Sequence, residues 1–228
     1  MSKKKIVIIL LIIFVSIALV ATIGMYLLDT SGKINQGNYR INDIVLESNL
    51  VVAEKDEQEV KDLSSLVFDI SQTNKITMLI DSKSEAKMIY IDNMYISTPT
   101  KLGKLYLTQN NYEEKFDLEN VGSKINIYPS NVDGQYKIEL CINNENCMQD
   151  VKVSSGTQSI RYDGTLLSFL NTRISDLKFN ISFNLNIIDA SNKKNVCKVK
   201  LEMPNEELIS NGISVLRLDI GKFVFTVE

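Results

Sequence analysis

The chain of 228 residues contains no histidine and no tryptophan. Histidine is the commonest general base and metal ligand, so its absence excludes Ser-His and Cys-His nucleophiles and histidine-containing zinc sites. An enzyme built from this sequence would depend on carboxylate or Ser-Lys chemistry. We therefore expect a protein that is not an enzyme and carries no cofactor.

Cysteine is scarce, and the three cysteines form no C-x-x-C pair of the kind that binds zinc. Cys141 and Cys147 flank an Asn-rich stretch that predicts a hairpin turn at Asn144-Glu145. A disulfide across that hairpin is the obvious candidate in an extracytoplasmic protein. The alternation of apolar residues, however, places the two cysteines on opposite faces unless a bulge shifts the register. The Cys141–Cys147 disulfide is thus the less favoured alternative, and Cys197 is expected to be a small core residue.

Charge is absent from the 23 residues between Ile6 and Leu28. As a helix this run is about 34 Å long, enough to cross a hydrocarbon core of about 30 Å. A secretory signal core has only about 7–15 apolar residues, and the best cleavage signal here, Thr22 and Gly24, is followed by more apolar residues. We expect an uncleaved transmembrane helix, with a cleaved signal peptide as the alternative.

Lys3, Lys4 and Lys5 place the N-terminus on the cytoplasmic side of the membrane. The expected organisation is a cytoplasmic flank (1–5), a membrane helix (6–28), a stalk (29–40) and an extracytoplasmic domain (41–228). Beyond the flank the formal charge is 22 − 28 = −6, which argues against nucleic acid as a partner. Abundant Lys, Asn, Ile and Tyr fit an AT-rich coding sequence, so we expect a cell-membrane protein of a low-GC bacterium.

Strand-like runs fill the rest of the chain. From Phe179 to Ile187 apolar residues alternate with Asn and Ser, and from Cys197 to Met203 they alternate with Lys and Glu. The loop at 190–195 between these two runs has the length of a hairpin connection. Similar runs lie at 44–52, 66–70, 76–80, 88–96, 102–107, 125–128, 136–142, 148–153, 214–219 and 223–227. This pattern predicts an all-β sandwich.

Two segments differ from this pattern. Residues 163–173 have leucines at helical spacing, and residues 54–62 form a charge run expected to be a solvated loop or short surface helix. A break at 154–157 could divide the region into two sandwiches, although no internal repeat supports a division.

The stretch "MIYIDNMYIST" from Met88 to Thr98 is apolar on both faces apart from Asp92 and Asn93, which predicts a central strand. Following "FDIS…ITMLID", it resembles the late strands of galactose-binding-like jelly rolls, including many carbohydrate-binding modules. The resemblance covers about thirty residues and implies a jelly-roll-like sandwich. In that family sugars usually stack on exposed aromatics, often Trp. With Trp absent, the candidate ligand-binding residues are Tyr106, Tyr112 and Tyr128.

Short catalytic patterns are weak here. The S-x-x-K pattern occurs at Ser84–Lys87 and Ser191–Lys194, each between strand-like runs and without its companion motifs. Adjacent carboxylates at Glu113-Glu114 and Glu206-Glu207 are expected to be solvated, and no D-x-D-x-D calcium loop is present. We therefore expect no catalytic and no metal-binding residues.

These observations favour a membrane-anchored envelope protein whose sandwich binds or assembles with another envelope protein. The alternative is a module that binds carbohydrate or cell-wall polysaccharide, and a carboxylate- or Ser-Lys-based hydrolase is the least favoured function.

Overall fold

A computed structural model describes residues 38–54, 66–98, 103–109, 112–118, 124–153, 170 and 172–228. The chain divides into two units, Met1–Gln36 and Gly37–Glu228, and all described residues belong to the second. The predicted membrane helix, most of the stalk, the charge run at 55–62 and the helical segment at 163–169 lie outside the described residues. Within these residues no helix is long and apolar enough to cross a membrane.

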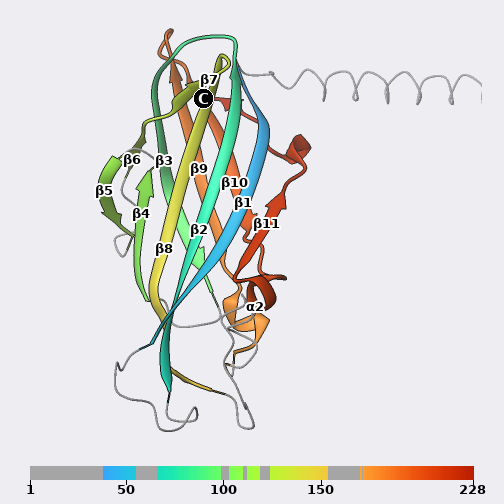
Figure 1. Cartoon of the computed structure of the whole chain (residues 1–228). Helices are drawn as coiled ribbons and strands as arrows, with labels where there is room; N and C mark the ends of the chain where they lie inside the picture. The colour runs from blue at the N-terminus through green and yellow to red at the C-terminus, as the bar shows by residue number, and fades with distance from the viewer. Residues whose placement is uncertain are drawn as a thin grey trace, which may run out of the picture. The chain divides into compact units, whose positions relative to one another are not determined.

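The described chain forms two antiparallel sheets (Figure 1). Sheet A has the order β11-β1-β2-β8-β4-β5, with β7 paired to β8, and sheet B has the order β12-β10-β9-β3-β6. The strands of sheet A are β1 (Tyr39–Glu54), β2 (Val67–Ser82), β4 (Lys104–Gln109), β5 (Tyr112–Asp117), β7 (Ser130–Val132), β8 (Gln135–Lys152) and β11 (Ile213–Arg217). Those of sheet B are β3 (Ala86–Ser97), β6 (Ile125–Ile127), β9 (Asn180–Asp189), β10 (Lys194–Glu202) and β12 (Thr226–Val227). The prediction of an all-β sandwich is confirmed.

Alternating side chains of both sheets bury one main core. Along β2 buried and half-buried residues alternate, so that Ile76, Met78 and Ile80 face inward. From sheet B, Phe179 and Leu185 enter the same cluster and are fully buried. Each such side chain stabilises the fold by about 1.5–3 kcal/mol relative to an exposed one. This shared core joins the two sheets into one sandwich.

A belt of buried polar residues crosses the inner face of sheet A, between the main core and a smaller apolar cluster. Ser48 Oγ donates to Asn74 Oδ1 at 2.7 Å, and Gln72 Nε2 donates to the same oxygen at 3.2 Å. Asn74 is fully buried, and its Nδ2 has no hydrogen-bond partner among the described residues. These polar residues therefore separate the main apolar core from the smaller apolar cluster along the strands of sheet A.

The predicted hairpin turn at Asn144-Glu145 is wrong. The chain instead continues as β8 through the Asn-rich stretch, because β2 and β4 pair with it on both sides. Asn143 pairs with Thr73 of β2, whose Oγ1 donates to Asn143 Oδ1 at 3.0 Å. The runs predicted at 66–70 and 76–80 are likewise parts of the single strand β2.

Other strand predictions agree with the structure. β9 and β10 form the predicted hairpin, with Lys194 opposite Ile188, and β3 is an inner strand between β9 and β6. The run at 223–227 contributes only the short β12, after the 3₁₀ turn η4 (Ile220–Lys222). Both sheets contain strands from before and after residues 154–157, so the described strands form one sandwich across that position.

Candidate functional site

The candidate tyrosines lie on different sheets. Tyr106 is on β4, and its hydroxyl donates to Glu145 Oε1 at 2.6 Å while the Lys115 ammonium lies 4.4 Å from the ring centroid. The hydrogen bond to Glu145, together with burial, raises the pKa of Tyr106 to about 12. Tyr128 follows β6 of sheet B and is 47% exposed. Tyr112 begins β5, and its side chain is not among those that the structure describes. The Tyr106 hydroxyl is therefore engaged by Glu145, and one face of its ring is covered by Lys115.

The side chains of the S-x-x-K patterns are engaged elsewhere. Ser84 Oγ donates to the Tyr39 hydroxyl at 3.2 Å, and Lys87 Nζ donates to Asn192 Oδ1 at 2.8 Å. Lys194 Nζ forms an ion pair with Glu228 at 2.5 Å. These contacts direct both lysines away from a role as base for the serine of their own pattern.

The two pairs of adjacent glutamates noted in the sequence show no catalytic pairing among the described residues. Glu206 and Glu207 are both exposed, immediately before α2 (Leu208–Asn211). Glu113 and Glu114 are in β5, where their side chains are not described. Over the described ranges no group of three Cys, Asp or Glu side chains is placed to hold a metal ion.

The three cysteines are free thiols. Cys141 and Cys147 lie on the single strand β8, six residues apart, so they are separated by about 20 Å. A disulfide needs Cβ atoms about 3.8 Å apart, and the hairpin that would bring these cysteines close is absent. Burial raises the pKa of Cys147 and of Cys197 to about 11, which favours the unreactive thiol form.

A β-bulge in β3 sets the direction of Tyr95. Asp92 pairs with Asn184 and Tyr95 pairs with Ser182, so three steps on β3 oppose two on β9. The bulge includes Asn93, whose φ is 50°. Ile89 and Ile91 are buried before the bulge, whereas after it the buried positions are 94 and 96. Strict alternation from Ile91 would bury residue 95, and the extra residue instead turns Tyr95 outward.

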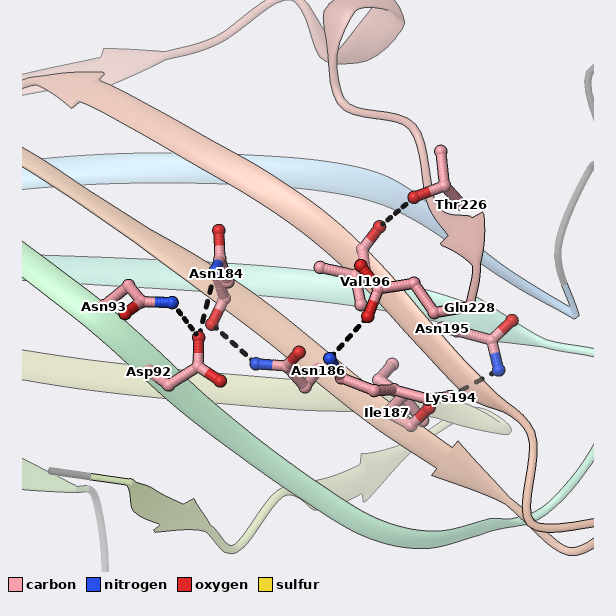
Figure 2. Close-up of polar contacts among 10 residues, drawn as sticks. All are labelled: Asp92, Asn93, Asn184, Asn186, Ile187, Lys194, Asn195, Val196, Thr226 and Glu228. Atoms are coloured by element: carbon pink, nitrogen blue, oxygen red, sulfur yellow. Dashed lines mark hydrogen bonds and ion pairs between the residues drawn. The ribbon is translucent and has the colours of Figure 1, made fainter. Parts of the chain in front are cut away.

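A small amide network holds this bulge (Figure 2). Asp92 Oδ1 accepts hydrogen bonds from Asn93 Nδ2 at 3.1 Å and from Asn184 Nδ2 at 3.0 Å. Asn186 Nδ2 donates to the main-chain oxygen of Asn184 at 3.2 Å. The carboxylate of Asp92 thus ties the bulge of β3 to the neighbouring strand β9.

Tyr95 lines a groove of about 460 Å³ on the outer face of sheet B. Tyr95 is 65% exposed, the most exposed of the large hydrophobic residues described. The other polar side chains that line the groove are Ser97, Asn180, Ser182, Lys200, Glu202 and Lys222. The alternation in the sequence gives no sign that Tyr95 is exposed, because only the bulge places this residue at the surface.

A second candidate surface lies at one edge of sheet A, where β11 is the edge strand and pairs with β1 (Figure 1). Ile213, Val215 and Leu216 of this edge strand are 39%, 56% and 42% exposed. A cleft of about 470 Å³ runs beside β11. It is lined by Val215, Leu216 and charged residues that include Lys200 and Glu206.

Comparison of the chain with protein-family models, curated proteins and solved structures finds no match.

Proposed function

We propose that this protein is a single-pass envelope protein, with its N-terminus in the cytoplasm, whose extracytoplasmic β-sandwich binds another envelope protein. The anchor rests on the uncharged run from Ile6 to Leu28 and on the three preceding lysines. As the finer fold class we propose a jelly-roll-like sandwich, supported by two antiparallel sheets over one core. The binding role rests on one observation, the open and apolar edge of β11.

The other described sheet edges carry features that discourage pairing with a second chain. β12 has two residues and β6 has three, and edges this short offer few main-chain groups. β5 has the sequence YEEKFD, in which four of six residues are charged. β11 has the sequence ISVLR, with one charged residue, Arg217, which forms a bidentate pair with Asp43 at 2.7 Å. Of these edges β11 is the one suited to receive an additional strand.

The free main-chain groups of β11 follow from its pairing with β1. Leu50 N donates to Gly212 O at 2.9 Å, and Leu218 N donates to Ile44 O at 3.0 Å. Because antiparallel pairs alternate, the even-numbered residues of β11 bond to β1 and the odd-numbered ones point their N–H and C=O groups outward. An extended segment of the partner would therefore pair with Ile213, Val215 and Arg217.

The substitution Val215→Pro tests this proposal. It removes an outward N–H while leaving the bonds between β11 and β1, and proline is tolerated in edge strands at such positions. The matched control Val215→Ile keeps both the donor and the apolar surface. A photo-crosslinking residue at position 213 of the full-length chain, in its native membrane, should give a discrete adduct that persists with Val215→Ile and disappears with Val215→Pro.

A crosslinking residue at Val132, which is 41% exposed on β7, serves as the second control. Equal adducts from positions 213 and 132, or an adduct that a folded Val215→Pro variant retains, would contradict strand addition at β11. The anchor is tested separately by extraction. The chain should resist alkaline washing of membranes and should be digested by protease added from outside the cell.

A further inference from the structure

We infer that the groove around Tyr95 binds an anionic saccharide, a sugar ring that carries a carboxylate or phosphate group. The ring would stack on Tyr95, and its anionic group would pair with Lys200 and Lys222. The inference goes beyond strand addition at β11, because it depends on the outer face of sheet B.

Tyr95 provides the stacking platform. The residue is 65% exposed, and its ring makes no ring or cation contact with a described residue. Its neighbour across the sheet is Ser182, whose small side chain leaves space beside the ring. By contrast Tyr90 is half-buried, and the Lys124 ammonium lies 4.0 Å from its ring centroid. An exposed aromatic face of this kind suits the C–H face of a pyranose.

Uncommitted hydrogen-bonding groups surround the platform. The side chains of Ser97, Asn180 and Ser182 line the groove and form no hydrogen bond with a described residue. They supply two hydroxyl groups and one amide that can donate to and accept from sugar hydroxyls. The volume of about 460 Å³ lies within the ordinary range of small-molecule sites, about 300–1,000 Å³. The volume and the hydrogen-bonding groups of the groove are therefore both compatible with a sugar ring.

Two lysines select for negative charge. Lys200 and Lys222 are exposed, line the groove, and form no ion pair within the described part of the chain. The one acidic residue of the groove, Glu202, already has Lys178 Nζ at 3.8 Å. These positive groups gather on a chain whose net charge is −3. The Lys222 ammonium lies 5.5 Å from the ring centroid of Phe223, but neither lysine has an anionic partner among the described residues. An uncharged sugar would leave both ammonium groups without a counter-charge, so an anionic sugar fits better.

A single strand of nucleic acid combines bases that stack with a negative backbone, but its usual sites offer several aromatic platforms for successive bases. The groove offers one, Tyr95, surrounded by hydroxyl and amide groups. A sugar ring matches this arrangement more closely.

The experiment measures binding to the full-length chain in detergent micelles by calorimetry. The probes are oligogalacturonate, which carries carboxylates, and phosphomannan, which carries phosphates. Unsubstituted mannan and oligothymidylate are the comparison ligands. We expect either anionic saccharide to bind, and the one that binds more tightly identifies the anionic group.

Variants connect binding to the groove. Tyr95→Ala should weaken binding about tenfold, whereas Tyr95→Phe keeps the stacking face and should change it less than about threefold. Tyr128→Ala is the matched control, an exposed tyrosine outside the groove, and should leave affinity unchanged. Lys200→Gln and Lys222→Gln should each weaken binding several-fold and flatten its dependence on salt. Lys200 and Lys222 also line the cleft beside β11, whereas Val215 lines that cleft alone. Val215→Pro should therefore leave saccharide binding unchanged while it removes the adduct at β11.

Four results would overturn the inference. One is no binding of either anionic saccharide by the folded chain at millimolar concentration. Two others are equal affinity for unsubstituted mannan and tighter binding of oligothymidylate. Loss of affinity in Tyr128→Ala equal to that in Tyr95→Ala would also overturn it.

Discussion

Gly103, just before β4, makes the closest backbone approach of the described glycines. A Cβ atom built at this position would lie 1.8 Å from the main-chain oxygen of Glu145 and 2.8 Å from its carbonyl carbon. These are main-chain atoms of β8, so no side-chain rotation relieves the clash. The Gly103 N–H also donates to Asn144 Oδ1 at 2.8 Å, and Asn144 is 1% exposed. A methyl group would therefore separate the two strands and break this bond.

The magnitude follows from these two contributions. Overpacking costs about 1–3 kcal/mol, and leaving a buried polar group without its partner costs about 1–3 kcal/mol. We expect Gly103→Ala to lower the free energy of unfolding by about 3 kcal/mol. For a domain of this size the melting temperature falls by about 2–4 °C for each kcal/mol, so the expected decrease is about 6–12 °C.

Two other glycines calibrate the measurement. At Gly221 the nearest atom to a new Cβ is Asp219 Oδ1 at 3.5 Å, so Gly221→Ala should change stability by less than about 0.5 kcal/mol. Gly212 has φ of 73° with open space around it, and alanine there should cost about 1–2 kcal/mol through backbone strain alone.

The assay is thermal unfolding of the full-length chain in detergent, followed by far-ultraviolet circular dichroism. The order of destabilisation should be Gly103→Ala, then Gly212→Ala, then Gly221→Ala. If Gly103→Ala melts within about 2 °C of the Gly221→Ala variant, the close approach of residue 103 to β8 does not contribute to stability and the reasoning is refuted.

Three further predictions concern the core and its titrating groups. Because burial raises the pKa of Cys147 and Cys197 to about 11, both thiols should react slowly with an aromatic disulfide reagent near pH 8, and rapidly in denaturant; rapid native reaction would contradict their burial. The pKa of Tyr106 is raised to about 12, so its contribution to stability is full below about pH 10 and is lost as the pH rises through 12. A phenolate absorbance titration should show this late transition, and Glu145→Gln should move it to lower pH. Phe179 is fully buried, so Phe179→Ala should cost about 3–5 kcal/mol in urea unfolding, and Phe179→Leu clearly less.

The sequence by itself determined the class of fold and the faces of its regular strands. From Phe179, just before β9, to Ile187 every second residue is apolar, and the structure buries all of these residues. It also buries Asn186, which the period of two places on the polar face. A period of two has one physical meaning, a strand with one face in a core, and β10 repeats it. The loop at 190–195 was short enough to fix the hairpin between them.

Only the tertiary structure decided where polar residues belong. Asn143 and Asn144 have the composition of a turn, yet they are central in β8 because Thr73 and the Gly103 N–H satisfy their side chains. Neither partner is near them in sequence, so local preference gave the wrong answer.

The candidate site shows the same limit. The bulge at Asn93 reverses the alternation of β3 and turns Tyr95 to the surface, where it meets residues of β9 and β10. Apart from Ser97, its neighbours in the groove lie more than eighty residues away in sequence, and they meet Tyr95 only because the strands pair in one register. Periodicity reports which face a residue occupies along one strand, whereas a binding surface depends on the register between strands. That register is fixed by long-range pairing, and it is why the exposed tyrosine of the groove was not among the tyrosines that the sequence singled out.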